Sequence, residues 1–264
     1  VVQDVNFELQ KGETLGIVGE SGSGKSVTAL SIMGLLPPSG QITHGNILFQ
    51  EEEQFVDFTL LPEKIYRTYR GKRMGMIFQE PMTSLNPVHR CGDQVAEVLR
   101  FHKGLSKKEA KAIVLEWFDK VKLPRTEEIY QSYPHQLSGG QKQRVMIAMA
   151  MCCHPDILIA DEPTTALDVT VQDDILKLIR ELQESFGIAV IFISHDLGVV
   201  GTLAAKVLVR YKGKVVEQGS AEDIFAHAKH PSTKGLLACR PMMGPHLRRL
   251  PVCKDFLAPT PGGE

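Results

Sequence analysis

Residues 19–26 read GESGSGKS, and this stretch decides the fold. It matches the G-x-x-x-x-G-K-[ST] pattern of a loop whose backbone N–H groups surround the phosphates of a nucleotide. In such a loop the lysine, here Lys25, reaches the β- and γ-phosphates, and the hydroxyl of Ser26 ligates Mg²⁺. We expect the nucleotide to contact a segment that runs one residue beyond the motif: Gly19, Glu20, Ser21, Gly22, Ser23, Gly24, Lys25, Ser26 and Val27.

The residues on either side of this loop predict the strand and helix that a phosphate-binding loop requires. Residues 14–19 form a short apolar run, typical of a strand, and residues 25–36 indicate a helix that the Pro-Pro-Ser-Gly sequence at 37–40 ends. A strand, a glycine loop and a helix in this order support the motif. They disfavour the alternative, a loop rich in glycine and serine that binds no ligand.

A second candidate phosphate-binding motif lies at residues 137–141, which read LSGGQ. These residues open a predicted helix over 138–153, and the first N–H groups of a helix lack intrahelical partners and attract anions. We therefore expect a phosphate to contact Ser138, Gly139, Gly140 and Gln141. Only one P-loop lysine accompanies the two motifs. The residues alone therefore leave open which nucleotide carries the phosphate that the second motif binds.

Two acidic residues, Asp161 and Glu162, end the apolar strand predicted over 157–161. In a P-loop fold an aspartate in this place helps to hold Mg²⁺. The adjacent Glu162 can accept a proton from the water that attacks the γ-phosphate. Two acids after a strand can also simply begin a loop, an alternative that the phosphate-binding loop disfavours.

Two more polar residues follow predicted strands. His195 comes after the apolar strand over 188–194, where it could hydrogen-bond the γ-phosphate and order the attacking water. Gln79 ends the strand over 73–79, where it could ligate Mg²⁺ or that water. A lone histidine is more often structural or exposed, and a strand-end glutamine is more often a bystander. Neither H-x-x-x-H nor paired C-x-x-C spacing occurs, so zinc is excluded.

Length and composition limit the remaining possibilities. A chain of 264 residues suits one large domain, with or without a small subdomain, and its net charge of −1 argues against general nucleic-acid binding. No apolar run approaches the roughly 18–20 residues that cross a bilayer, and no secretory leader opens the chain. The chain begins with Val1, so we expect an N-terminus that has been trimmed or left out. Five cysteines without framework spacing suit a reducing compartment: Cys91, Cys152, Cys153, Cys239 and Cys253.

The alternation of predicted strands and helices indicates an α/β core with right-handed crossovers. We expect a strand over 1–9, short strands around an acidic turn within 45–61, and a helix over 168–186. Helical periodicity begins near Cys91, and Ser106 and Glu109 fit a capping box. The predicted parts are a first core part with a β subdomain (1–88), a helical subdomain (89–137), a second core part (138–229) and a tail (230–264) with one short helix.

In this order the motifs resemble those of the ATP-binding subunits of ABC transporters: residues 19–26, Gln79, 137–141, Asp161-Glu162, 166–168 and His195. The resemblance implies a P-loop NTPase (RecA-like) core with an N-terminal antiparallel β subdomain and an inserted α-helical subdomain. It also implies a head-to-tail dimer that encloses two ATP molecules with Mg²⁺. Each ATP would lie between the phosphate-binding loop of one subunit and Ser138, Gly139 and Gly140 of the other, and Asp168 would couple the two sites.

A narrower resemblance is to the oligopeptide, dipeptide and nickel importers, on residues 78–87 and 230–237. It implies two transmembrane permease subunits, a substrate-binding protein, no nucleic acid, and a peripheral position on the cytoplasmic side of the inner membrane. In this family an aromatic residue that stacks on adenine precedes the first core strand, and we expect it to be absent from a chain that starts at Val1. No iron–sulfur site is expected at Cys239 and Cys253. The alternatives are an ABC ATPase of DNA repair or translation and a binding module without hydrolysis.

Overall fold

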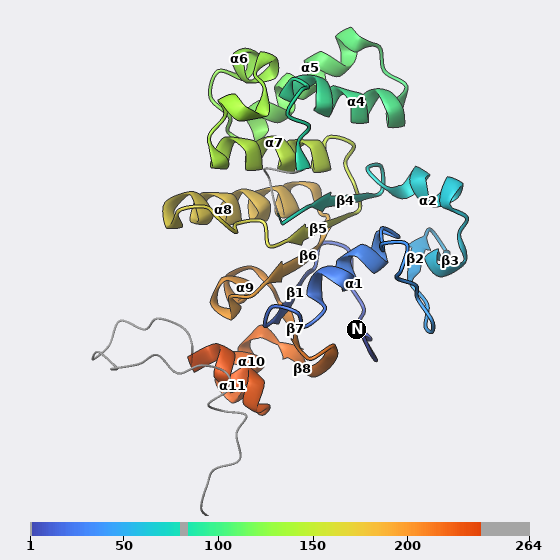
Figure 1. Cartoon of the computed structure of the whole chain (residues 1–264), viewed down its shortest axis with the longest axis vertical. Coiled ribbons are helices and arrows are strands. Elements are labelled where there is room, and N and C mark those ends of the chain that lie inside the picture. The colour runs from blue at the N-terminus through green and yellow to red at the C-terminus, as the bar shows by residue number, and fades with distance from the viewer. Residues whose placement is uncertain (1, 80–83, 239–264) are drawn as a thin grey trace, which may run out of the picture. The chain divides into compact units, whose positions relative to one another are not determined.

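The computed structural model of the protein describes residues 2–79 and 84–238 (Figure 1). The chain divides into two compact units: Val1–Thr28 with Ile191–Glu264 form the first, and Ala29–Val190 form the second. The division falls inside helix α1 (Lys25–Ile32) and inside strand β6 (Ala189–Ser194).

The first unit contains a mixed sheet. Strand β1 (Thr14–Gly19) runs parallel to β7 (Lys206–Tyr211), with Gly19 opposite Arg210, and β7 runs antiparallel to β8 (Lys214–Ser220). All residues of β1 are buried, as expected for a strand covered on both faces. The described part of this unit also contains the start of α1 and the helices α9 (Leu197–Leu203), α10 (Ala221–His227) and α11 (Pro231–Ala238).

The second unit begins with a small antiparallel hairpin. Strands β2 (Leu48–Glu51) and β3 (Gln54–Asp57) meet at the predicted acidic turn, where Glu52 has a φ of 52°. The 3₁₀ turn η1 (Phe58–Leu60) and helix α2 (Glu63–Tyr69) follow. Strand β4 (Met74–Ile77) then pairs in parallel with β5 (Ile157–Asp161), so the predicted α/β character is confirmed in both units.

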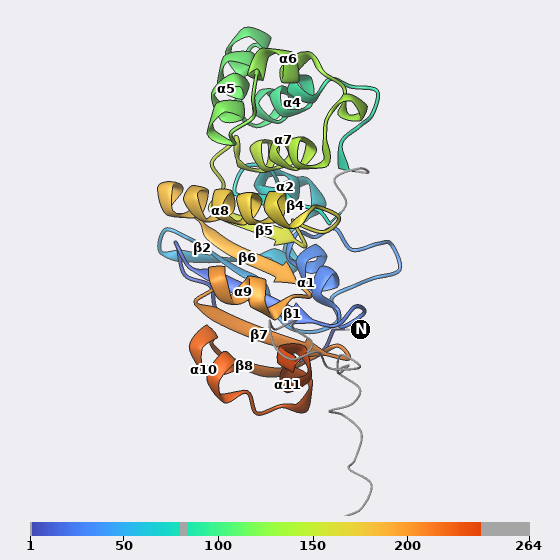
Figure 2. The same cartoon turned by 90° about the vertical axis from the view of Figure 1, so that its left-hand side faces the viewer.

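Five α-helices and a 3₁₀ turn make up much of the rest of the described second unit: α4 (Cys91–Lys103), α5 (Lys107–Lys120), α6 (Thr126–Gln131), η2 (Pro134–Gln136), α7 (Gly139–Met151) and α8 (Val169–Phe186). The predicted capping box is present, because Ser106 accepts from the N–H of Glu109 and the carboxylate of Glu109 accepts from the N–H of Ser106. Helices α7 and α8 lie side by side (Figures 1 and 2). Trp117 and Phe118 of α5 are fully or almost fully buried.

Helix α1 ends at Ile32, four residues before its predicted end. Gly34 adopts a φ of 60°, and the N–H of Leu35 donates to the carbonyl of Leu30 at 2.8 Å, which closes the helix before the prolines. From α2, the hydroxyl of Tyr66 donates to the carbonyl of Ile32 at 2.6 Å. Arg70, next to α2, donates to the carbonyls of Met33 and Gly34 at 2.6 and 2.7 Å. The left-handed conformation of Gly34 and the side chains of Tyr66 and Arg70 therefore set the end of α1.

The strand predicted over 1–9 is wrong. Among residues 2–9 only Gln3 pairs, in an isolated bridge with Lys214, and its N–H donates to the carbonyl of Gly213 at 2.8 Å. Asp4 adopts a φ of 49°, which turns the backbone out of the extended conformation. The short helix predicted for the tail is α11, and residues 239–264, with Cys239 and Cys253, lie outside the described residues.

Candidate functional site

The predicted phosphate-binding loop joins β1 to α1 in the first unit. The ammonium group of Lys25 donates to the carbonyls of Gly19 at 2.7 Å and Glu20 at 3.2 Å, and the side chain is 5% exposed. Gly22 and Gly24 have φ values of 78° and 92°, a backbone conformation that strains other residues. The glycines of the motif are thus required by the path of the loop around the lysine.

His195 lies directly after β6, in the first unit, and is exposed. The next residue, Asp196, is the N-cap of α9: its carboxylate accepts from the N–H groups of Gly198 at 2.7 Å and Val199 at 3.4 Å. The N–H of Asp196 in turn donates to the hydroxyl of Ser194 at 3.0 Å. These bonds fix the turn that presents His195.

The predicted acids lie at the end of β5 in the second unit. Asp161 is the last residue of the strand and is 4% exposed. Glu162 follows with a φ of 47°, a left-handed conformation that is uncommon for a residue with a side chain. Its Oε2 accepts hydrogen bonds from the amide nitrogen of Gln79 at 3.3 Å and the hydroxyl of Thr165 at 3.0 Å. The structure thus brings two predicted site residues together and adds Thr165, which no sequence motif indicated.

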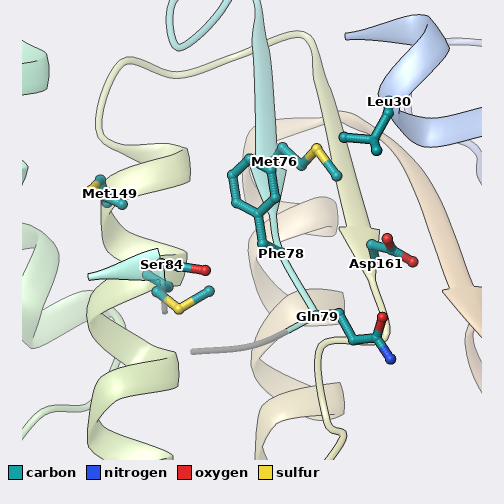
Figure 3. A pocket seen from close by; sticks show the side chains of 8 residues that line it. Leu30, Met76, Phe78, Gln79, Ser84, Met149 and Asp161 are labelled. Carbon is teal, nitrogen blue, oxygen red and sulfur yellow. The ribbon is translucent and has the colours of Figure 1, made fainter. Parts of the chain in front are cut away.

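A pocket of about 470 Å³ lies beside these residues. Figure 3 shows Asp161 and Gln79 on one side of it and Met149 on the other, with Met76 and Phe78 between them. The lining residues are Leu30, Met76, Phe78, Gln79, Ser84, Met146, Met149 and Asp161. The pocket is therefore apolar along β4 and α7 and polar where the strands end.

The LSGGQ motif begins α7, as predicted. The hydroxyl of Ser138 accepts from the N–H of Gln141 at 3.3 Å, and the amide oxygen of Gln141 accepts from the N–H of Ser138 at 3.0 Å. Gly140 lies so close to α8 that a Cβ there would be 2.7 Å from Cγ1 of Val171, and one at Gly139 would be 3.3 Å from Cδ2 of Leu167. The two glycines let the start of α7 approach the start of α8, and Ser138 and Gly139 remain exposed.

Asp168 is the N-cap of α8. Its carboxylate accepts a hydrogen bond from the N–H of Val171 at 3.0 Å, and the side chain is exposed. The predicted role of Asp168 across a dimer interface stays a prediction. Within one chain, Asp168 sets where α8 begins.

The predicted ligands of Mg²⁺ are Ser26, in the first unit, and Asp161 and Gln79, in the second. All offer the oxygen atoms that this cation prefers, and the amide nitrogen of Gln79 is used by Glu162, which leaves its oxygen for a cation. No group of three or more His, Cys, Asp or Glu residues within 2–79 and 84–238 could hold a metal alone. Within the second unit, Asp161 and Gln79 line one pocket, and two such oxygen ligands suit Mg²⁺, which keeps water and phosphate oxygens in its shell.

Comparison with protein families decides what kind of chain holds these residues. The family model described as ABC transporter matches residues 2–165. The chain belongs to the ABC transporter family. The predicted family is thereby confirmed.

Curated members of the ABC transporter family resemble the chain over most of its length. It is 51% identical to the dipeptide transport ATP-binding protein DppD of Bacillus subtilis (strain 168), over 99% of this chain and 78% of that one. It is 48% identical to the oligopeptide transport ATP-binding protein AppD of the same organism, over 98% and 78%. It is 51% identical to the glutathione import ATP-binding protein GsiA of Pectobacterium atrosepticum over 92% of this chain, but spans only 39% of that protein.

Solved ABC cassettes have the same fold. A dimeric structure of the cassette MJ0796 matches with a TM-score of 0.73 at 29% identity, over 83% of this chain and 90% of that one. The cassette cbiO1 from Clostridium perfringens matches with a TM-score of 0.70 at 30% identity, over 86% and 84%. The predicted P-loop NTPase fold is confirmed.

Helices within residues 2–79 and 84–238 are all too short or too polar to cross a membrane.

Proposed function

We propose that this ABC chain is the ATP-hydrolysing subunit of a membrane importer whose cargo is a peptide. The observation that supports hydrolysis is the carboxylate of Glu162, held by Gln79 and Thr165 one residue after the buried Asp161. The observation that supports peptide cargo is the likeness to DppD and AppD over nearly all of this chain.

In the proposed reaction the glycine loop binds the phosphates of ATP through its N–H groups and Lys25. Ser26, Asp161 and Gln79 would hold Mg²⁺, which neutralises negative charge on the phosphates when it is bound. Glu162 accepts the proton of the attacking water, and His195 hydrogen-bonds the γ-phosphate and orders that water. Catalysis rests mainly on the positions of these groups and on charge stabilisation.

The proposed assembly is a head-to-tail dimer with a second ATPase subunit. The N–H groups of Gly139 and Gly140, with the hydroxyl of Ser138, would contact the γ-phosphate bound to the neighbour's loop. Supporting this, Ser138 and Gly139 are exposed at the N-terminus of a 13-residue helix, where anions bind favourably. ATP closes the dimer, and hydrolysis reopens it.

The remaining partners are two transmembrane permease subunits and a binding protein that delivers cargo, with the ATPase on the cytoplasmic side of the inner membrane. Affinity purification of the chain in mild detergent, followed by mass spectrometry, tests this assembly. We expect hydrophobic permease subunits, and a binding protein whose bound solute is a peptide. Recovery of ribosomes or nucleic acid instead would favour an ATPase of translation or DNA repair.

A further inference from the structure

Arg210 is fully buried in the first unit, on β7 directly behind the phosphate-binding loop. Its Nη1 donates to the carbonyl of Gly24 at 2.9 Å and to the hydroxyl of Thr28, and its Nη2 donates to the carbonyl of Gly213 at 2.9 Å. Gly24 and Thr28 flank Lys25, Ser26 and Val27. The guanidinium therefore holds both ends of the turn that carries the predicted phosphate and cation ligands.

The charge of Arg210 has no carboxylate partner among the described residues. All of its hydrogen bonds go to neutral oxygens, and its Nε has no acceptor. Burial lowers the pKa of the guanidinium, yet arginine stays protonated in proteins. A buried cation without an anion destabilises a fold and raises its affinity for anions that bind nearby.

We propose that Arg210 is a positioning residue for nucleotide binding: it fixes the loop from behind, and its charge increases the affinity of that loop for polyphosphates. This inference rests on the proposed function, in which residues 19–27 bind ATP. Arg210 lies on β7, far from residues 19–27 in the sequence, so its contribution to nucleotide binding is not part of the phosphate-binding motif.

Arg210→Met tests the inference because the carbonyl groups that accept from Arg210 also accept hydrogen bonds from other donors, and so stay hydrogen-bonded in the variant. The carbonyl of Gly24 also accepts from the N–H of Thr28 at 3.0 Å and from the Thr28 hydroxyl at 3.0 Å, and the carbonyl of Gly213 accepts from the N–H of Gln3. Arg210→Lys keeps the charge on a shorter side chain. Lys206→Met is the matched control, because it removes an exposed charge from the same strand.

Binding of ATP and ADP to the full chain is measured by calorimetry, together with Tm in the absence of nucleotide. For Arg210→Met we expect an ATP Kd raised roughly tenfold, because one charge within about 10 Å of phosphate has about this effect at an effective dielectric constant near 20. The ADP Kd should rise less, because ADP carries less charge. Arg210→Lys and Lys206→Met should stay within about threefold of wild type, and Tm without nucleotide should not fall in Arg210→Met.

Wild-type ATP affinity in Arg210→Met would overturn the inference. So would an equal loss for ATP and ADP that accompanies a lower Tm, because that result describes a merely structural residue. If Arg210→Met does not fold, Arg210→Gln is compared with Arg210→Lys, and weaker ATP binding by the glutamine variant is expected. A failure of the proposed function looks different, because wild type and Lys25→Ala would then bind ATP equally poorly.

Discussion

The amide nitrogen of Gln79 lies 3.3 Å from Oε2 of Glu162 and donates a hydrogen bond to it, across 83 positions of sequence. The glutamine follows β4 and the glutamate follows β5, two parallel strands whose carboxyl ends meet at one edge. The carboxylate proposed as the general base is thus hydrogen-bonded to the second residue of the loop after β4. Its position and the position of that loop depend on each other.

Glu162→Gln should abolish turnover and leave ATP binding intact. The amide has nearly the same shape but cannot accept the proton of water, so we expect kcat to fall by about 100- to 10,000-fold. Phosphate release measures turnover, and size-exclusion chromatography with ATP should show the closed dimer accumulating. Near-normal phosphate release would rule out Glu162 as the base.

Thr165→Val tests whether orientation of this carboxylate matters. The substitution keeps the shape but removes the hydroxyl that donates to Glu162 at 3.0 Å. We expect kcat to fall about three- to tenfold, in line with the roughly 1 kcal/mol of one hydrogen bond, with the ATP Kd unchanged. Thr170→Val, on the exposed first turn of α8, is the control. Equal kcat values in the two variants would show that Glu162 needs no help from Thr165.

Two inactive variants should restore each other if the ATP site is shared between subunits. Ser138→Arg blocks the exposed start of α7, and Lys25→Ala removes the loop ammonium, so neither homodimer should hydrolyse ATP. Mixed dimers combine an intact loop from one chain with an intact Ser138 from the other. ATPase activity should therefore reappear on mixing the purified chains, and complete inactivity of proven mixed dimers would contradict the shared site.

Gly140→Ala should destabilise the protein because its Cβ would lie 2.7 Å from Cγ1 of Val171. We expect the free energy of unfolding, measured with urea, to fall by about 1–3 kcal/mol. Val171→Ala in the same chain should recover part of this loss. Gly139→Ala is the milder control, because its nearest atom would be 3.3 Å away. Equal effects of the two alanines, without recovery in the double variant, would contradict this packing argument.

The attachment of α11 should weaken in acid through Glu217. Burial acts to raise the pKa of this carboxyl, but the side chain of Thr233 in α11 and hydrogen bonds from the N–H groups of Lys229 at 2.8 Å and His230 at 3.1 Å together hold the pKa below its usual value. A lowered pKa in the folded state means that the stabilisation is complete above the unfolded value of about 4.3. It is lost as the pH falls through the lower, folded pKa.

Hydrogen exchange in α11, measured at neutral pH and near pH 3, checks this pH dependence. Protection should fall in acid for wild type and should be lower at neutral pH, with less change in acid, for Glu217→Gln. Glu222→Gln, in the exposed first turn of α10, serves as the control for loss of one surface charge. Wild-type protection in Glu217→Gln at neutral pH would show that the carboxylate does not hold α11.

Much of the site is predictable because its residues belong to short local patterns. The loop around Lys25, the cap formed by Ser138 and the two acids at the end of β5 each depend on a few neighbouring residues. Thr165 and Arg210 were missed because their partners are set by tertiary structure: Arg210 contacts Gly24, which is 186 positions away. One feature of the sequence could have indicated Arg210: this charged residue directly follows the apolar run Val207–Val209. Burying a charge in a strand costs free energy unless the charged group is hydrogen-bonded or paired.

The fold shows the same division between local and distant causes. The capping box of α5 and the hairpin turn at Glu52 were predicted from neighbouring residues and are present. Residues 1–9 alternate like a strand, but Asp4 turns the backbone, and among the described residues 2–9 only Gln3 pairs. Helix α2 was not predicted, and its Tyr66 helps to end α1 through a bond that spans 34 positions.

The left-handed backbone of Glu162 means that stability and the proposed role of its carboxylate favour different residues at this position. At a φ of 47° glycine loses little, whereas a residue with a Cβ costs about 1 kcal/mol or more. A library selected only for heat resistance would drift toward Glu162→Gly and discard the carboxylate. Consensus design or directed evolution of this protein therefore needs selection for ATP hydrolysis as well as for stability, so that the glutamate at position 162 is kept.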